Sequence, residues 1–172
     1  SVGSDNFQGG HDITAHLLDQ GRRRIAFLGH ASSHYPEFAE RYRGHAQALR
    51  THGLEAEPAL QHDAITTEES GHAACAALLA SGQRFDAVCA ASDLIAIGAL
   101  RALRAHGLRV AQAQSLLQSS YLSVEAVALQ CGYVDAGSLR KVFARVVGMT
   151  PGAYRQRFGL RTSRKQWAGP EH

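Results

Sequence analysis

The chain has 172 residues, of which 45% are hydrophobic and 19% are charged. This mixture excludes a disordered or collagen-like chain and fits one or two compact domains. No window approaches the roughly 18 apolar residues of a membrane span, and the start, SVGSDNFQGG, lacks the basic and apolar stretches of a secretory signal. We therefore expect a cytoplasmic protein with no membrane partner.

The charge is distributed unevenly along the chain. Residues 1–110 carry a net charge of −2, and residues 111–172 carry +5. An acidic first part followed by a basic second part is typical of a sensing unit joined to a unit that meets polyanions. The alternative is a solvated basic face with no partner.

The first part shows the alternation of a parallel α/β sheet. Short apolar runs at 23–29 and 85–91 are typical of buried strands, and a weaker strand is expected near 57–63. Helical patterns lie between these runs, which favours right-handed β-α-β units. Four helices are expected: from a cap at Asp5 to about Gln20, from Pro36 to Gly53, from a cap at Thr67 to Gly82, and from a cap at Asp93 to Gly107.

Apolar periodicity indicates which sides of the first and fourth helices face the core. The residues on these faces are Ile13, Leu17 and Leu18 in the first helix, and Leu94, Ile97, Leu100 and Leu103 in the fourth. The sheet is expected to have about three strands, which places the strand 85–91 at an edge.

The strand signal disappears after Arg109. Helices are expected at 110–118, 123–130, 136–147 and 151–158. Ser123 and Asp135 are suited to cap the second and third of these helices, and Gly132 supplies the turn between them. The fold class is therefore α/β: a partial, doubly wound parallel sheet with flanking helices, followed by an all-α helix-turn-helix module.

The helix 136–147 is amphipathic. The inward positions are Leu139, Val142, Phe143 and Val146. The opposite face carries Arg140, Lys141 and Arg145, as a helix that enters a DNA groove requires. If these three side chains packed against the first domain instead, the DNA interpretation would fail.

Other chemistries find little support in the sequence. Cys75, Cys89 and Cys131 form no CxxC motif, so we expect reduced, buried thiols. His30 and His34 have i, i+4 spacing, but Pro36 disfavours a helix there and no carboxylate motif accompanies them, so no metal is expected. Without a GxSxG, GxGxxG or GxxxxGK[ST] motif, we expect neither an enzyme nor a cofactor.

Residues 2–110 resemble part of the effector-binding domain of LacI/GalR-type repressors. The matching segments are VGSDNFQGG, HLLDQGRRRIAFLG, ERYRGHAQALRTHGL and FDAVCAASDLIAIGALRALRAHGLRV. The resemblance implies the C-terminal lobe of a periplasmic-binding-protein-like domain with a sugar or purine effector, held by Asp5, Arg41 and Asp93. Carboxylates accept hydrogen bonds from sugar hydroxyls, and arginine donates in pairs. The alternative for Arg41 and Asp93 is a surface ion pair and a helix cap.

Residues 109–158 are similar to the second helix-turn-helix of the AraC/XylS family, on the segments LSVEAVALQCGY and GMTPGAYR. The resemblance implies duplex DNA binding through the helix 136–147. The base-reading positions it implies are Ala136, Gly137, Ser138 and Lys141, with Arg140 and Ser123 near phosphates. Ala136 and Gly137 have no hydrogen-bonding side chain, so Lys141 is the best candidate for a guanine edge, and Arg140 and Arg145 for backbone charge.

Together the resemblances predict a DNA-binding transcription regulator. Its expected parts are a LacI-like lobe at 1–109, an AraC-like module at 110–160 and a basic flexible tail at 161–172. Each family contributes a fragment, and the only methionine is Met149, so we expect a processed, trimmed, recombined or engineered chain. With one lobe, effector binding should be weak; with one reading helix, DNA binding should need a homodimer. The alternatives are an effector-binding or dimerisation module, or a chimera, without DNA-binding activity.

Overall fold

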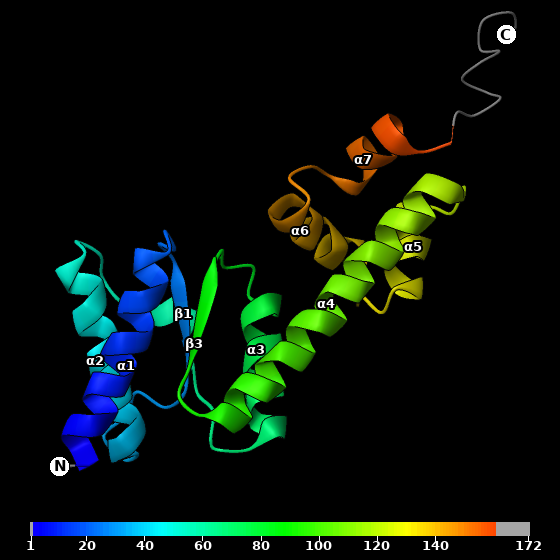
Figure 1. Ribbon diagram of the computed structural model, residues 1–172. Helices are drawn as coiled ribbons and strands as arrows, with labels where there is room; N and C mark the ends of the chain where they lie inside the picture. Colours follow the sequence, from blue (N-terminus) through cyan, green and yellow to red (C-terminus); the bar gives the residue numbers. More distant parts are fainter. Residues whose placement is uncertain (1, 161–172) are drawn as a thin grey trace, which may run out of the picture. The chain divides into compact units, whose positions relative to one another are not determined.

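The computed structural model describes residues 2–160, which fall into two compact units (Figure 1). The first unit extends to Arg104 and the second begins at Ala105. The predicted boundary at 109/110 lies five residues later, inside the same helix. The predicted tail 161–172 lies outside the described residues.

The first unit is a three-stranded parallel sheet flanked by helices, as the alternation predicts. The strand order is β2-β1-β3, with Phe27 of β1 in register with Gln61 of β2 and Cys89 of β3. Figure 1 shows α1 and α2 on one face of the sheet and α3 on the other. The elements are α1 (Val2–Asp19), β1 (Ile25–Leu28), α2 (Pro36–Thr51), the 3₁₀ turn η1 (Pro58–Leu60), β2 (Gln61–His62), α3 (Glu68–Ala80), β3 (Ala87–Ala90) and α4 (Asp93–Ser119).

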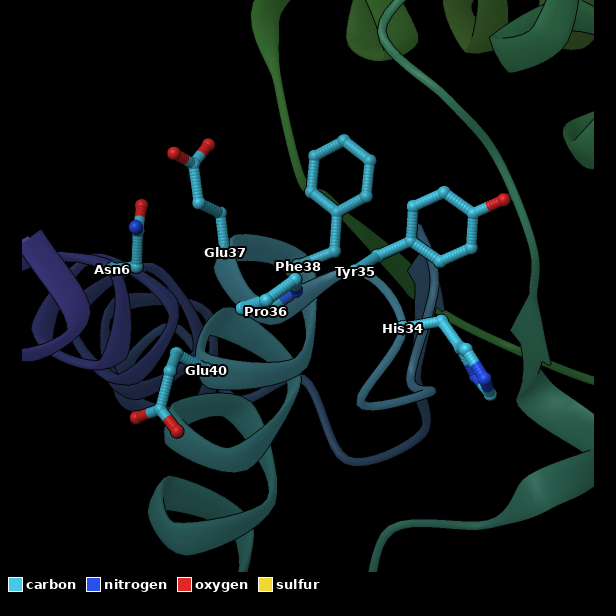
Figure 2. Close-up of a pocket in the computed structure, with 7 residues that line it drawn as sticks. All are labelled: Asn6, His34, Tyr35, Pro36, Glu37, Phe38 and Glu40. Atoms are coloured by element: carbon cyan, nitrogen blue, oxygen red, sulfur yellow. The ribbon is translucent and has the colours of Figure 1, made fainter.

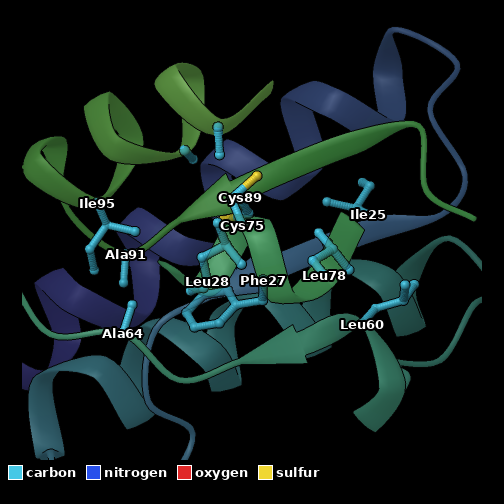
Figure 3. Packing of buried hydrophobic residues seen from close by; sticks show 14 of the residues in the cluster. Ile25, Phe27, Leu28, Leu60, Ala64, Cys75, Leu78, Cys89, Ala91 and Ile95 are labelled. Atoms are coloured by element: carbon cyan, nitrogen blue, oxygen red, sulfur yellow. The ribbon is translucent and has the colours of Figure 1, made fainter. Parts of the chain in front are cut away.

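The core of this unit lies on both faces of β1. All four residues of β1 are buried, which is the burial pattern of a strand covered on both sides. Figure 3 shows Phe27 and Leu28 of this strand among Cys75 and Leu78 of α3. Contacts from β3 and the start of α4 complete the cluster through Cys89 and Ile95. The central strand is thus the most protected element of the unit.

Two helix pairs approach so closely that glycine is required at each crossing. A Cβ on Gly10 of α1 would lie less than 3.0 Å from the carbonyl oxygen of Arg41 of α2, and one on Gly44 would meet the carbonyl oxygen of Phe7. The same reciprocal arrangement joins α3 and α4, where a Cβ on Gly71 or Gly98 would meet the backbone of the partner helix. A side chain at these positions would force the helices apart.

The helix α4 corrects one prediction from the sequence. Instead of ending at Gly107 and restarting at 110, it is continuous from Asp93 to Ser119. Gly107 does not adopt a positive φ. Val110, Ala113 and Leu117, which follow the glycine at helical spacing, are buried in a second hydrophobic core. Their burial stabilises the helical conformation past Gly107 by more than the glycine destabilises it.

The predicted caps at Asp5 and Asp93 are also wrong. The helix α1 already begins at Val2, so Asp5 lies within its first turn. At α4, Oγ of Ser92 accepts a hydrogen bond from the backbone N–H of Ile95 at 3.3 Å, and Asp93 is the first helical residue. An acidic side chain in the first turn still favours the helix through its macrodipole.

The predicted inward faces of α1 and α4 need correction as well. Ile13 is 48% exposed, whereas Leu18 is buried. On the part of α4 that belongs to the first unit, the buried hydrophobic residues are Ile95, Ala99 and Ala102. An exposed apolar stripe on this helix consists of Leu94, Ile97 and Leu100. Small residues pack against the sheet because the glycine crossing with α3 leaves little room for larger ones.

The second unit packs the end of α4 against α5 (Val124–Gln130), α6 (Ala136–Val146) and α7 (Pro151–Phe158). Leu139 and Phe143 of α6 are fully buried, and the Phe143 ring meets Tyr154 of α7 edge to face at 5.6 Å. Val146 was expected to be buried but is 53% exposed, because it lies on the last turn of α6, past this cluster.

The three cysteines are free and buried, as predicted. Burial raises the pKa of the Cys75 and Cys89 thiols to about 11 and raises the pKa of Cys131 as well. Among the helices that the structure describes, none is long and apolar enough to cross a membrane.

Candidate nucleic-acid interface and effector pocket

The helix α6 is fixed at its start by Asp135. Oδ1 of Asp135 accepts hydrogen bonds from the backbone N–H of Ser138 at 2.8 Å and from its hydroxyl at 3.0 Å. These bonds lower the pKa of the Asp135 carboxyl. The cap therefore stays ionised at neutral pH and stabilises the exposed N-terminus of α6.

The exposed face of α6 carries most of the positions predicted to bind DNA. Gly137, Arg140 and Lys141 are exposed. Nη2 of Arg140 lies 3.4 Å from Oε2 of Glu125, in an ion pair whose two side chains are 52% and 68% exposed. Such a solvated pair is weak. The Arg140 guanidinium can therefore leave it for a phosphate at little cost.

Ser123 begins the helix that supports α6. Its Oγ accepts a hydrogen bond from the backbone N–H of Ala126 at 3.1 Å. The hydroxyl proton is not used by this cap, so the exposed Ser123 can still donate to a phosphate oxygen. The buried Val127 and Ala128 pack α5 against the core of the unit.

Arg145 departs from the prediction. It was expected to project away from the core, but it is only partly exposed, and burial lowers the pKa of its guanidinium. It lies one turn after Lys141 on α6 and interacts electrostatically with Tyr133. The exposed basic face of α6 is thus formed by Arg140 and Lys141.

One residue of this surface escaped the sequence analysis. Val134, directly before the Asp135 cap, is 85% exposed. An exposed apolar side chain beside a reading helix is suited to contact the methyl group of thymine. One sign of this position is visible in the sequence: Val134 is apolar but does not belong to the apolar face of α5 or of α6.

In the first unit, a small cavity brings two of the three predicted effector residues together. It has a volume of about 140 Å³ and includes Asp5, Gly10 and Arg41 in its lining, with Ala90 and Ala91 from the end of β3. Crevices at the carboxyl ends of parallel strands are where open α/β sheets bind ligands. Asp93 does not line this cavity.

Arg41 is held in a fixed orientation. Its Nε donates a hydrogen bond to Oδ1 of Asn6 at 2.8 Å, and its Nη1 donates to the backbone carbonyl of Ala91. Neither bond is to a carboxylate, so the surface ion pair considered for Arg41 is not the arrangement that the structure shows. Its remaining N–H groups can serve a ligand.

A larger pocket of about 570 Å³ lies nearby (Figure 2). Tyr35, Glu37 and Phe38 extend from the start of α2, and Asn6 contributes from α1. The Tyr35 ring stacks on the His30 ring, with centroids 3.7 Å apart. Aromatic faces beside carboxylate and amide groups form a surface suited to a polyhydroxylated ligand.

Sequence reasoning missed this pocket. Asn6 is one residue from the predicted Asp5, and neither Asn6 nor Phe38 was assigned to a site. Among the described residues, no group of three or more His, Cys, Asp or Glu side chains is placed to hold a metal ion.

Comparisons with known proteins agree with this division into two kinds of site. A model of the periplasmic binding protein-like domain matches residues 14–120, and a model of a helix-turn-helix domain matches residues 99–157. The two matches overlap at 99–120, almost all of which lies in α4.

Relatives of each part are transcription regulators. The regulator CelR of Thermobifida fusca is 40% identical over 109 residues, which cover 63% of this chain and 32% of CelR. The activator RhaR of Klebsiella pneumoniae is 44% identical over 50 residues, which cover 29% of this chain and 18% of RhaR. A solved complex of a regulator CelR with cellobiose has a TM-score of 0.57 at 40% identity, over 60% of this chain and 31% of that one. The chain thus spans about a third of the length of CelR.

Proposed function

Because the chain belongs to the periplasmic binding protein-like family and continues into a helix-turn-helix, we propose that it is a transcription regulator that binds duplex DNA through α6. The observation that carries this proposal is the capped helix α6, which buries Leu139 and Phe143 and exposes Arg140 and Lys141. Such a protein would act in the cytoplasm, and its known relatives are regulators rather than enzymes.

Each predicted residue takes a role in this proposal. Lys141 is the candidate for reading a guanine edge, and Gly137 and Ser138 allow close approach at the start of α6. Arg140 and Ser123 hold phosphates on either side. Arg145 supports α6 from its partly buried position.

The proposal is tested by fluorescence anisotropy of a mixed-sequence duplex at several salt concentrations. Lys141→Glu should weaken binding by about tenfold or more and reduce the salt dependence, because a cation on the DNA-facing side of α6 is replaced by an anion. The matched control is Arg22→Glu, which makes the same charge change at an exposed arginine in the turn after α1. Equal binding by the two folded variants would contradict the role of α6.

We further propose that the regulator binds DNA as a homodimer. The described residues hold one reading helix, and operators for such modules are bound by two in register. The edge strand β3 and the exposed stripe Leu94, Ile97 and Leu100 offer an apolar surface for a second copy. The same titration should reach saturation at two chains per duplex.

For the first unit, we propose a sugar effector at the carboxyl ends of the strands. The fixed Arg41 and the adjacent Asp5 would hydrogen-bond sugar hydroxyls, and the ring of Tyr35 offers a stacking surface. Asp93 lies at the start of α4 and outside the lining of both cavities, so its contact with the effector stays a prediction. The complex of CelR with cellobiose makes cellobiose the first probe.

Cellobiose should bind weakly, with a Kd of about 1 mM. Asp5→Asn should weaken this binding by about tenfold, because a charged acceptor is replaced by a neutral one. Asp12→Asn is the matched control: it lies on the same helix, is exposed, and lines neither cavity. Chemical shifts of the backbone amides near Ala91 report binding, and shifts that are absent or unaffected by Asp5→Asn would contradict the site.

A further inference from the structure

The strand β3 is paired on one side only. Among the described residues, the sheet ends at this strand, in the order β2-β1-β3 (Figure 1). The backbone groups of successive residues in a strand point alternately to its two sides. About half of the N–H and C=O groups of Ala87–Ala90 therefore point away from β1. Such a row of unpaired groups is a template for another strand.

The two edges of the sheet differ in their protection against strand pairing. At one edge, β2 has only two residues, Gln61 and His62, and Asp63 follows directly. Short edge strands and nearby charges are common means by which soluble proteins prevent pairing with another chain. At the other edge, β3 has four residues, AVCA, and none of them is charged or a proline. The edge at β3 thus lacks the protection that the edge at β2 has.

A groove of about 480 Å³ follows the unpaired edge of β3. Ala87 and Val88 both line it, although successive side chains of a strand point to opposite faces, so the groove passes around the edge of the sheet. The other wall belongs to α4. The lining is mostly apolar and consists of Phe85, Asp86, Ala87, Val88, Ala90, Ala96, Ala99, Leu100 and Leu103. A pairing strand would find backbone partners and an apolar surface together, which favours a polypeptide over a small ligand.

Opposite charges lie at the two ends of β3. Arg84 precedes the strand and Asp93 follows it, and both side chains are exposed. Within the described part of the chain, neither takes part in an ion pair. The carboxylate of Asp86 is already engaged, because it accepts hydrogen bonds from the backbone N–H groups of Arg23 and Arg24 at 2.9 and 3.0 Å. The free charges are therefore positive at the start of β3 and negative at its end.

We propose that two copies of this chain pair antiparallel through the outer edge of β3, so that their sheets join into one. An antiparallel pair places the start of each strand beside the end of the other. Arg84 of each copy would then lie near Asp93 of the second copy, at two equivalent contacts. A parallel pair would bring Arg84 beside Arg84 instead. The inference rests on the homodimer proposed above, and it names the surface and the direction in which the two copies meet.

The first test is sedimentation velocity of the chain without DNA, over a range of concentrations. Arg84→Asp and Asp93→Arg each place like charges at both contacts, so each should raise the Kd of the dimer by about tenfold or more. An equal mixture of the two variants should associate about as tightly as the parent, because both contacts again join opposite charges.

The matched control is Arg50→Asp, which makes the same charge change at an exposed arginine in the last turn of α2. This variant should dimerise like the parent, because Arg50 lies outside the lining of the groove. Equal Kd values for Arg84→Asp and Arg50→Asp, or no recovery in the mixture of the two β3 variants, would overturn the proposal.

The second test is amide hydrogen exchange, which reports whether the strand edge itself is covered. The amides of β3 that point away from β1 should be protected well above the Kd of the dimer and should exchange at least about tenfold faster after dilution below it. If two copies met only through the exposed stripe Leu94, Ile97 and Leu100, a dimer would form but these amides would exchange equally fast at both concentrations. That result would overturn the strand pairing.

These measurements separate the strand pairing from the proposed function. A chain that dimerises through β3 but binds no duplex would contradict the DNA interpretation and leave the pairing standing. A chain that binds duplex as a dimer, with β3 amides that exchange freely, would overturn the pairing and leave the regulator standing. A parent chain that stays monomeric at every concentration, with and without duplex, would overturn both the pairing and the homodimer.

Discussion

Gly10→Ala is expected to unfold the first unit or to destabilise it by about 4 kcal/mol. The new Cβ would fall less than 3.0 Å from the carbonyl oxygen of Arg41, which is backbone and cannot rotate away. The crossing of α1 and α2 would have to widen along its whole length, and the buried residues beneath it, Leu18 and Leu49, would lose contacts. Gly44→Ala, at the reciprocal position, should behave in the same way.

The neighbouring residue supplies the control. A Cβ on Gly9 meets nothing within 4 Å. Gly9→Ala should therefore stabilise the helix by about 0.5–1 kcal/mol, since alanine has the higher helix propensity. Urea unfolding followed by far-ultraviolet circular dichroism measures both variants. Similar midpoints for Gly9→Ala and Gly10→Ala would show that the crossing is looser than the structure indicates.

Acid is expected to remove about 3 kcal/mol of stability through one histidine, His45. Its ring is 2% exposed, lies 2.8 Å from Oγ1 of Thr14 and packs against Phe27 and Tyr42. Burial lowers its pKa from the ordinary 6.5 to about 4. Between these two values the unfolded chain binds a proton that the folded chain excludes, so stability is complete above about pH 7 and falls as the pH drops to 4.

His45→Gln isolates this effect, because it cannot titrate. His106, whose pKa is also lowered, is present in both chains and cancels in the difference. The free energy of unfolding of the parent minus that of His45→Gln should fall by about 3 kcal/mol between pH 7.5 and pH 4. A difference independent of pH would show that the buried imidazole is protonated as easily in the folded chain as in the unfolded one.

Local chemistry made much of this fold predictable. Thr67, Ser123 and Asp135 each precede a helix and accept a backbone N–H from its first turn, as their side chains predict. The two apolar runs became β1, which is buried along its whole length, and β3, which is partly buried at the edge of the sheet. These signals depend on a few neighbouring residues, and the sequence displays them in full.

Prediction from the sequence was weaker where tertiary packing decides where a helix ends or which of its faces is buried. Gly107 is a stop signal by local rules, but the second core holds α4 helical through it. Leu94, Ile97 and Leu100 have the helical spacing of a buried face, but they are exposed. The close crossing of α3 and α4 at two glycines places the smaller side chains of α4 against the core instead. At the candidate sites, Asp5 and Arg41 line one cavity, and their role there stays a prediction. The hydrogen bond from Arg41 to Asn6 and the partly buried position of Arg145 depend on contacts between distant segments, which the sequence does not display.

The three buried thiols make local opening of each unit separately observable. Cys75 and Cys89 belong to the first unit and Cys131 to the second. With raised pKa values and almost no exposure, none of them reacts readily with an alkylating reagent while its surroundings stay closed. Mass spectrometry of the alkylated peptides would therefore time the opening of each unit in one unmodified molecule, with no dye, mutation or isotope added.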